Sequence, residues 1–150
     1  MNFKDLLERG VVEKYTPDSE QIQTLQERAL KDLASARALG ASDPEWVYVI
    51  SYEAMLRAGK CLLLAKGYRP RGRDIPKTII TAMSAVGGEP LKPLVNLMDL
   101  MRRRRAQALD EMNRPIPRYE GEQALEHAEK FVAHVLRLAR KSHTQLTLFR

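Results

Sequence analysis

The sequence predicts an all-α protein folded as an up-and-down bundle of five or six helices. Apolar residues recur at three- and four-residue steps through most of the chain, which is typical of helices that bury one face. The alternation expected of strands is absent. Capping residues, prolines and glycines stand where these periodic stretches begin and end. At 150 residues the chain can bury a sufficient core without a staple, and its single cysteine, Cys61, rules out an internal disulfide.

The first half of the chain predicts three helices. A short helix covers residues 3–9, and residues 16–20 offer caps for a second helix that ends at Gly40. A third helix runs from Asp43 to about Lys66 and is apolar around most of its circumference. We therefore expect it to be the central helix of the bundle and a candidate to line a dimer seam. The core face of the second helix is expected to consist of Ile22, Leu25, Ala29, Leu33 and Ala36.

The second half predicts a loop at residues 67–73 and three more helices. A short helix capped by Asp74 ends at Gly87, and a long helix covers about residues 91–112. A last helix starts near Gly121, after two prolines that break the chain. The apolar stripe of the long helix is expected to consist of Leu94, Met98, Met101, Ala108 and Met112. We divide the chain into a helical bundle over residues 1–143 and a tail over residues 144–150.

The positive charge is concentrated in the middle of the chain. Residues 1–60 carry 8 basic and 10 acidic side chains, whereas residues 61–118 carry 12 basic and 5 acidic ones. A localised positive field is what a polyanion-binding surface requires. Solubility alone is the alternative explanation.

No signal in the sequence points to a membrane, a metal or a cofactor. The N-terminal residues lack an apolar signal core, and no stretch is apolar enough to cross a bilayer, so we expect a cytoplasmic protein without membrane contact. His127 and His134 share one flank of the last helix, but no further ligand is suitably spaced, and we interpret them as structural. We expect no metal and no cofactor.

Four consecutive arginines, residues 102–105, are the most conspicuous chemical feature. At helical spacing Arg105 falls within the apolar stripe, where a guanidinium needs a carboxylate, a cleft or a partner chain. One interpretation places Arg105 and Arg104 at a cleft between helices or subunits, with Glu53 as a candidate partner for Arg105. The alternative is that the stem of Arg105 lies along the stripe while its charged end reaches solvent.

Four segments, at residues 25–37 (LQERALKDLASAR), 51–72 (SYEAMLRAGKCLLLAKGYRPRG), 100–110 (LMRRRRAQALD) and 124–132 (ALEHAEKFV), follow one another in a familiar order. Together they resemble the HEPN family, a helical nucleotide-binding bundle of higher eukaryotes and prokaryotes. The resemblance implies the fold and, for active members, a metal-independent ribonuclease built across a dimer cleft. Their signature is an Arg followed a few residues later by a His, or in some relatives a Tyr.

The catalytic signature is degenerate here. Arg104 or Arg105 matches its arginine, but Leu109 or Asp110 stands where the His or Tyr would be. Acid–base cleavage of RNA needs a group that titrates near neutral pH, and leucine has none. We expect no imidazole or phenol beside the arginines. The resemblance thus supports the fold and argues against the activity.

The favoured hypothesis is a binding protein: a catalytically degenerate HEPN domain, expected to be a homodimer, that contacts RNA, DNA or a nucleotide through a basic cleft. One alternative is a weak metal-independent ribonuclease that uses Arg104 or Arg105. The other, implied by the resemblance, is a toxin or partner of a minimal nucleotidyltransferase in a toxin–antitoxin pair. The candidate contacts come from the arginine run and from the loop after the central helix: Arg102, Arg104, Arg105, Arg69, Arg71 and Arg73. A purely solvated loop is the alternative for the last three.

The tail carries a separate signal. Gln145-Leu146-Thr147-Leu148-Phe149 resembles the pentapeptide by which bacterial replication and repair proteins dock on the DNA sliding clamp. In that interpretation Leu146, Leu148 and Phe149 fill an apolar pocket while Gln145 hydrogen-bonds at its entrance. The alternative is that Leu146 and Phe149 pack on the bundle.

Overall fold

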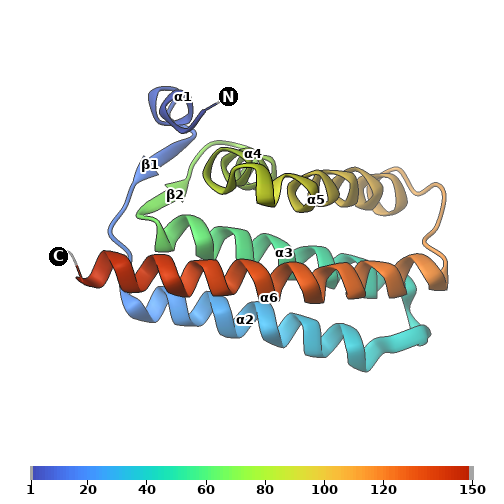
Figure 1. Ribbon diagram of the computed structural model, residues 1–150. Coiled ribbons are helices and arrows are strands. Elements are labelled where there is room, and N and C mark those ends of the chain that lie inside the picture. Colours follow the sequence, from blue (N-terminus) through green and yellow to red (C-terminus); the bar gives the residue numbers. More distant parts are fainter. Residues whose placement is uncertain (1, 149–150) are drawn as a thin grey trace.

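The computed structural model describes residues 2–148, with side chains up to residue 144, and this part of the chain is a helical bundle (Figure 1). The all-α prediction is confirmed. None of the described helices is long and apolar enough to span a membrane. The α-helices are α1 (Phe3–Glu8), α2 (Ser19–Leu39), α3 (Pro44–Ala65), α4 (Ile75–Gly87), α5 (Lys92–Arg105) and α6 (Arg118–Leu148).

Side-chain caps begin three of the helices where the sequence predicts them. The Asp18 carboxylate accepts a 2.7 Å hydrogen bond from the Gln21 amide at the start of α2. Asp43 and Asp74 accept in the same way from the third residue of α3 and α4, at 3.2 Å in both cases. Each carboxylate satisfies an amide that the first turn leaves unpaired and complements the positive end of the helix.

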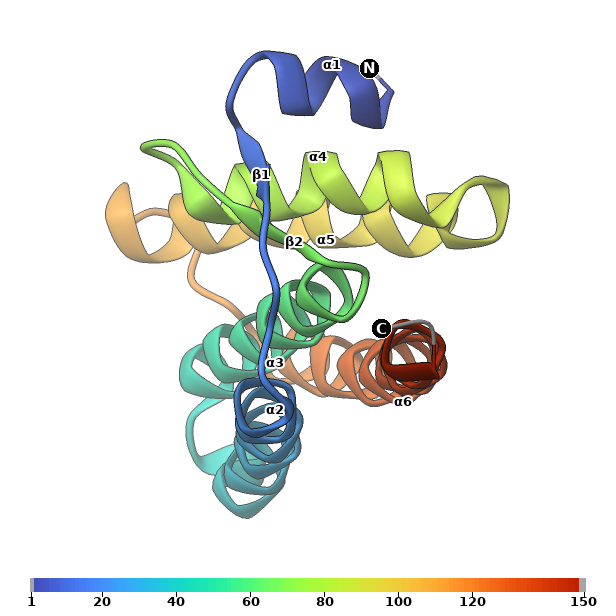
Figure 2. The same ribbon diagram turned by 90° about the vertical axis from the view of Figure 1, so that its left-hand side faces the viewer.

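Helix α3 is the centre of the bundle, as its composition predicts. It packs against α2 and α6 on one side, and the α4–α5 pair covers another side (Figure 2). A Cβ on Gly121 would lie 3.0 Å from the Pro44 carbonyl oxygen, so α6 begins beside the start of α3, and the two helices run in the same direction (Figure 1). Helix α2 runs the opposite way: Arg37 near its end pairs with Glu129 in the first half of α6 at 2.7 Å, and Ser19 at its start lies 3.3 Å from His143 near the end of α6. The apolar circumference of α3 is thus largely buried within one chain.

A small antiparallel sheet joins the N-terminal segment to the loop after α3. Strand β1 (Val12–Lys14) pairs with β2 (Tyr68–Pro70), with Val12 opposite Pro70. Strand β2 lies within residues 67–73, which the sequence predicts as a loop, because three-residue strands are too short to show alternation. The Phe3 and Tyr68 rings, 4.4 Å apart in an edge-to-face contact, hold α1 against the sheet.

The helix that carries the arginine run ends earlier than predicted. Helix α5 stops at Arg105, and residues Ala106–Asp110 form a π-helical turn closed by the Glu111 amide on the Ala106 carbonyl at 3.0 Å. Met112, predicted to belong to the apolar stripe, is 86% exposed in the following loop. Helix α6 begins at Arg118, before the predicted start at Gly121, and its backbone stays helical through residues 144–148.

Candidate nucleic-acid interface

The first two arginines of the run share one carboxylate. Arg102 donates to Asp99 Oδ1 from Nε at 3.1 Å and from Nη2 at 3.0 Å. Arg103 reaches the other oxygen of Asp99, at 2.8 Å from its Nη2. One carboxylate therefore sits between two guanidinium groups and neutralises only part of their charge.

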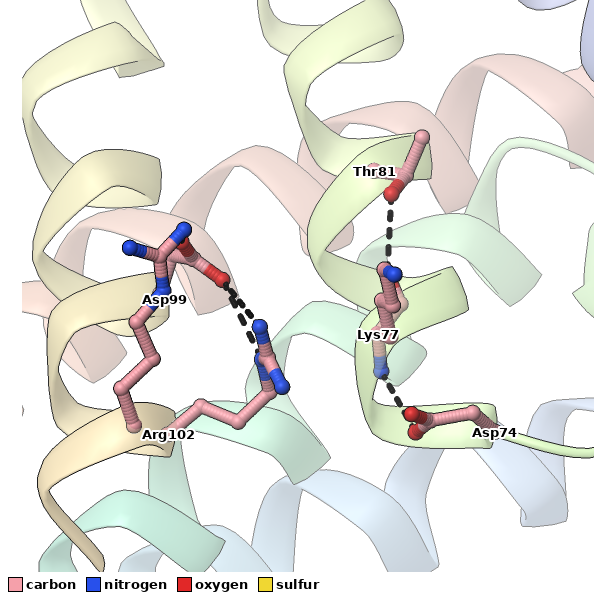
Figure 3. A network of polar contacts seen from close by, with 6 residues as sticks. Asp74, Lys77, Thr81, Asp99 and Arg102 are labelled. Carbon is pink, nitrogen blue, oxygen red and sulfur yellow. Dashed lines mark hydrogen bonds and ion pairs between the residues drawn. The ribbon is translucent and has the colours of Figure 1, made fainter. Parts of the chain in front are cut away.

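A polar groove lies beside this pair, between α4 and α5. Its volume is about 560 Å³, within the range of ligand-binding clefts. Figure 3 shows Asp99 and Arg102 on α5 next to the turn of α4 that carries Lys77 and Thr81. Ile80 and Val95, both buried, contribute apolar lining. The polar lining residues are Lys77, Thr81, Ser84, Asn96, Asp99, Arg102 and Arg103.

Arg104 lies outside this groove and ties α5 to α6. Its Nη2 lies 3.1 Å from Glu120 Oε1, and its Nη1 and Nη2 donate to the Arg114 and Pro115 carbonyl oxygens at 2.6 and 3.2 Å. The hydrogen bond with Glu120 raises the pKa of Arg104 further above its already high value. The clamped loop contains two non-glycine residues with positive φ, Met112 at 54° and Arg114 at 51°. Arg104 therefore holds a strained connection.

Arg105 does not line the groove, and its charge acts on Tyr52 of α3. Its Nε is buried without a hydrogen-bond partner among the described residues, and it forms no ion pair there with Glu53, its predicted partner. The Tyr52 hydroxyl is also buried and without a hydrogen-bond partner among those residues. Burial raises the pKa of Tyr52 to about 12, an effect that Glu53 adds to and that nearby Arg102 and Arg105 oppose.

Two phenols therefore stand beside the arginines, contrary to expectation. Burial, followed by the charge of Glu120, raises the pKa of Tyr48 to about 12, with Arg104 acting in the opposite direction. Tyr48 and Tyr52 lie one helical turn apart on α3, a spacing visible in the sequence, but only the packing of α5 on α3 brings them to the arginine run. At neutral pH both phenols stay protonated and can donate hydrogen bonds.

The loop arginines gather at the sheet instead of the groove. Glu13 on β1 pairs with Arg69 and lies 3.6 Å from Arg71 Nε. The Arg69 guanidinium also stacks 4.8 Å from the centroid of the Tyr15 ring. Arg73 is exposed and does not line the α4–α5 groove. The two predicted sets of arginines thus belong to separate surfaces.

The predicted tail contacts are only partly described. The backbone of Gln145, Leu146 and Leu148 continues α6, but their side chains, and all of Phe149, lie outside the described residues.

The HEPN domain model matches residues 22–138, which is more than half of the chain. The chain belongs to the HEPN domain family. Membership supports a nucleotide-binding or ribonuclease-like function, and HEPN domains often form dimers. Comparisons with curated proteins and with solved structures give no match. The match covers both α3 and the arginine run, so the groove is formed within the HEPN domain.

Proposed function

We propose that this HEPN protein binds RNA, DNA or nucleotides through the α4–α5 groove without cleaving them. The observation that carries the proposal is the convergence of Lys77, Arg102 and Arg103 on one cavity that contains a single carboxylate, Asp99. Guanidinium forks match phosphate oxygens, and a net positive cleft concentrates phosphates near it. The hydroxyl and amide groups that line the same groove supply further donors.

The environment of the arginine run favours binding over catalysis. Leu109 and Asp110 occupy the π-helical turn where the family's signature would place its His or Tyr. Tyr48 and Tyr52 are held as neutral phenols, with pKa values of about 12, so neither accepts a proton at neutral pH. Arg104 is committed to Glu120 and to the loop before α6. We therefore expect no RNA cleavage by the purified protein. Cleavage that disappears in an Arg105→Ala variant would favour the residual-ribonuclease alternative.

Salt-dependent binding tests the proposal. Fluorescence anisotropy with short RNA and DNA strands should show affinity that falls with ionic strength. The Arg102→Ala/Arg103→Ala variant is expected to bind roughly 10-fold or more weakly, with a log–log salt slope shallower by about 2, since two phosphate contacts are lost.

The matched control removes the same charge elsewhere. Arg137 and Arg140 are exposed on α6 and do not line the groove. Replacing both with Ala should leave affinity and slope close to wild type. Equal losses in both double variants, or an unchanged slope in the α5 variant, would mean that binding is non-specific and that the groove is not the site.

A second candidate function rests on the sequence Gln145–Phe149. We propose that this segment docks on a bacterial DNA sliding clamp, with its leucines and Phe149 as the anchors. Since residues 145–148 continue α6, extended docking requires the last helical turn to open, which costs little at a helix end. Leu146→Ala/Phe149→Ala should abolish binding to a purified clamp, whereas Thr147→Ala should not. Wild-type protein that fails to bind the clamp rejects this candidate.

Homodimerisation and pairing with a nucleotidyltransferase remain predictions for this chain. Sedimentation of the purified protein tests the first. Co-purification with a nucleotidyltransferase encoded beside it tests the second.

A further inference from the structure

A second pocket lies away from the α4–α5 groove and shares no lining residue with it. Its volume is about 540 Å³, enough for a small metabolite. The walls come from the segment that leads into α2, the first turns of α2, the end of α3 and strand β2. Apolar lining is supplied by Leu25, Leu64 and Pro70.

Two cations on this pocket have unused hydrogen-bonding capacity. Lys60, half-buried on α3, makes no ion pair or hydrogen bond among the described side chains. Its neighbour one turn earlier, Arg57, is by contrast paired with buried Asp32. Arg69 contacts Glu13 through Nε, and among the described residues its terminal nitrogens have no hydrogen-bond partner. A partly desolvated ammonium without a counter-ion favours an incoming anion.

The wall beside these cations is flat and already ordered. The Tyr15 ring carries the stacked Arg69 guanidinium, and the Tyr15 hydroxyl lies 3.0 Å from Gln21 Oε1 and 2.7 Å from Gln21 Nε2. The Tyr15 backbone amide donates to the Gly67 carbonyl at 2.9 Å. A planar ligand therefore meets a preformed surface, which lowers the entropic cost of binding.

The acidic rim limits the charge that the pocket accepts. Asp18 and the exposed Glu20 line the same pocket, and Glu13 lies against Arg69. Since these carboxylates would repel a chain of phosphates, the pocket differs in kind from the α4–α5 groove. A single negative charge at Lys60 and Arg69, joined to an apolar body over Leu25 and Leu64, fits both the charges and the lining.

We infer that the pocket between α2, α3 and β2 binds a small organic monocarboxylate with a flat apolar body. The carboxylate pairs with the Lys60 ammonium, the ring lies beside the Tyr15–Arg69 stack, and Leu25, Leu64 and Pro70 cover its apolar surface. This site is independent of nucleic-acid binding.

The test is an amide chemical-shift titration of the full chain with benzoate, cinnamate and indole-3-acetate. At least one acid should cause saturable shifts confined to residues 15–25 and 60–70. Benzamide, which has the ring of benzoate but no charge, should bind about 10-fold more weakly than benzoate, as expected for the loss of a charge-assisted hydrogen bond. Phenyl phosphate should also bind more weakly, because its second charge meets the acidic rim.

Two variants and one control locate the effect. Lys60→Met should weaken carboxylate binding about 10-fold, while Lys66→Met, the same change at an exposed lysine outside the pocket, should not. Thr24→Trp, at an exposed position on the pocket wall, should block binding without changing any charge. Nucleic-acid affinity of the Lys60 variant should stay at the wild-type value.

Three results would overturn the inference. The first is the lack of saturable shifts in residues 15–25 and 60–70 with all three acids. The second is benzamide or phenyl phosphate binding as tightly as the carboxylates. The third is equal loss in the Lys60 and Lys66 variants.

Discussion

Arg103 and Arg104 are neighbours on α5, yet they lie in opposite environments. The Arg103 side chain is 69% exposed and shares Asp99 with Arg102 at the edge of the groove. The Arg104 side chain is 17% exposed and binds Glu120 and two backbone carbonyls at the α5–α6 corner. A rotation of about 100° per residue separates an exposed charge from a partly buried one.

The difference shows that a run of like charges need not act as one unit. Arg102 and Asp99 are partly exposed and Arg103 is exposed, and an ion pair that water reaches contributes little to stability. A ligand phosphate can therefore replace Asp99 at Arg102 and Arg103 at low cost. The partly buried guanidinium of Arg104 is harder to exchange, because several partner groups would lose their hydrogen bonds together. Thus Arg102 and Arg103 belong to the proposed function, and Arg104 belongs to the fold.

The largest expected effect is that of Arg104→Ala on stability. Removing the guanidinium breaks the ion pair with Glu120 and the hydrogen bonds to the Arg114 and Pro115 carbonyls, and it frees a strained loop. We expect a loss of about 3 kcal/mol in the free energy of unfolding, measured by urea denaturation. Arg118→Ala, which breaks an exposed pair with Glu122, should cost less than about 0.5 kcal/mol. Similar costs for the two variants would contradict the comparison, as would weaker RNA binding by folded Arg104→Ala protein.

The free energy of unfolding should also depend on alkaline pH, through Tyr48 of α3, on which the charges of Glu120 and Arg104 act. Tyr48 has a pKa of about 12 in the folded protein, against 10.0 for an exposed tyrosine. Because the folded-state pKa is raised, its contribution to stability is fully present below pH 10 and is lost as pH rises toward 12. Tyr48→Phe should therefore flatten the fall in unfolding free energy between pH 10 and 12, by roughly 2 kcal/mol. Parallel curves for wild type and variant would show that burial of this phenol does not contribute.

In the α4–α5 groove, a substitution at Asp99 should change the affinity for nucleic acid. Asp99→Asn removes the carboxylate that Arg102 and Arg103 share. Because Asp99 then no longer competes with phosphate, we expect RNA or DNA to bind about 5-fold more tightly, with a steeper salt slope. Asp110→Asn, the same change at an exposed carboxylate after α5, is the control. If Asp99→Asn leaves nucleic-acid affinity unchanged or lowers it, while Asp110→Asn has no effect, Asp99 positions the arginines for the ligand.

The division within the arginine run could be predicted only in part from sequence. Periodicity and caps identified every α-helix, because these signals are local. The π-helical turn after Arg105 was not predicted. The helical stretch ends at Asp110, so Met112 lies in the following loop and is exposed instead of belonging to the apolar stripe.

Contacts between segments far apart in the sequence could not be predicted either. Glu120 lies sixteen positions after Arg104 in the sequence, and Tyr52 lies on a different helix from Arg105. Neither spacing carries a pattern, since each contact depends on how the helices pack. The pocket between α2, α3 and β2 was not predicted for the same reason, because its walls come from three separate elements.

The smallest expected effect is that of Tyr52→Phe. Tyr52 lies on α3, where the charges of Arg102 and Arg105 both act on it. Its hydroxyl is buried without a hydrogen-bond partner among the described residues, close enough to Arg102 and Arg105 for their charges to act on it. Since the hydroxyl is desolvated without compensation, Tyr52→Phe should leave stability unchanged or raise it by at most about 1 kcal/mol. Nucleic-acid affinity should be unaffected, because Tyr52 does not line the groove. A variant that is equally stable but binds RNA more weakly would instead make this phenol a ligand donor and extend the interface from α5 onto α3.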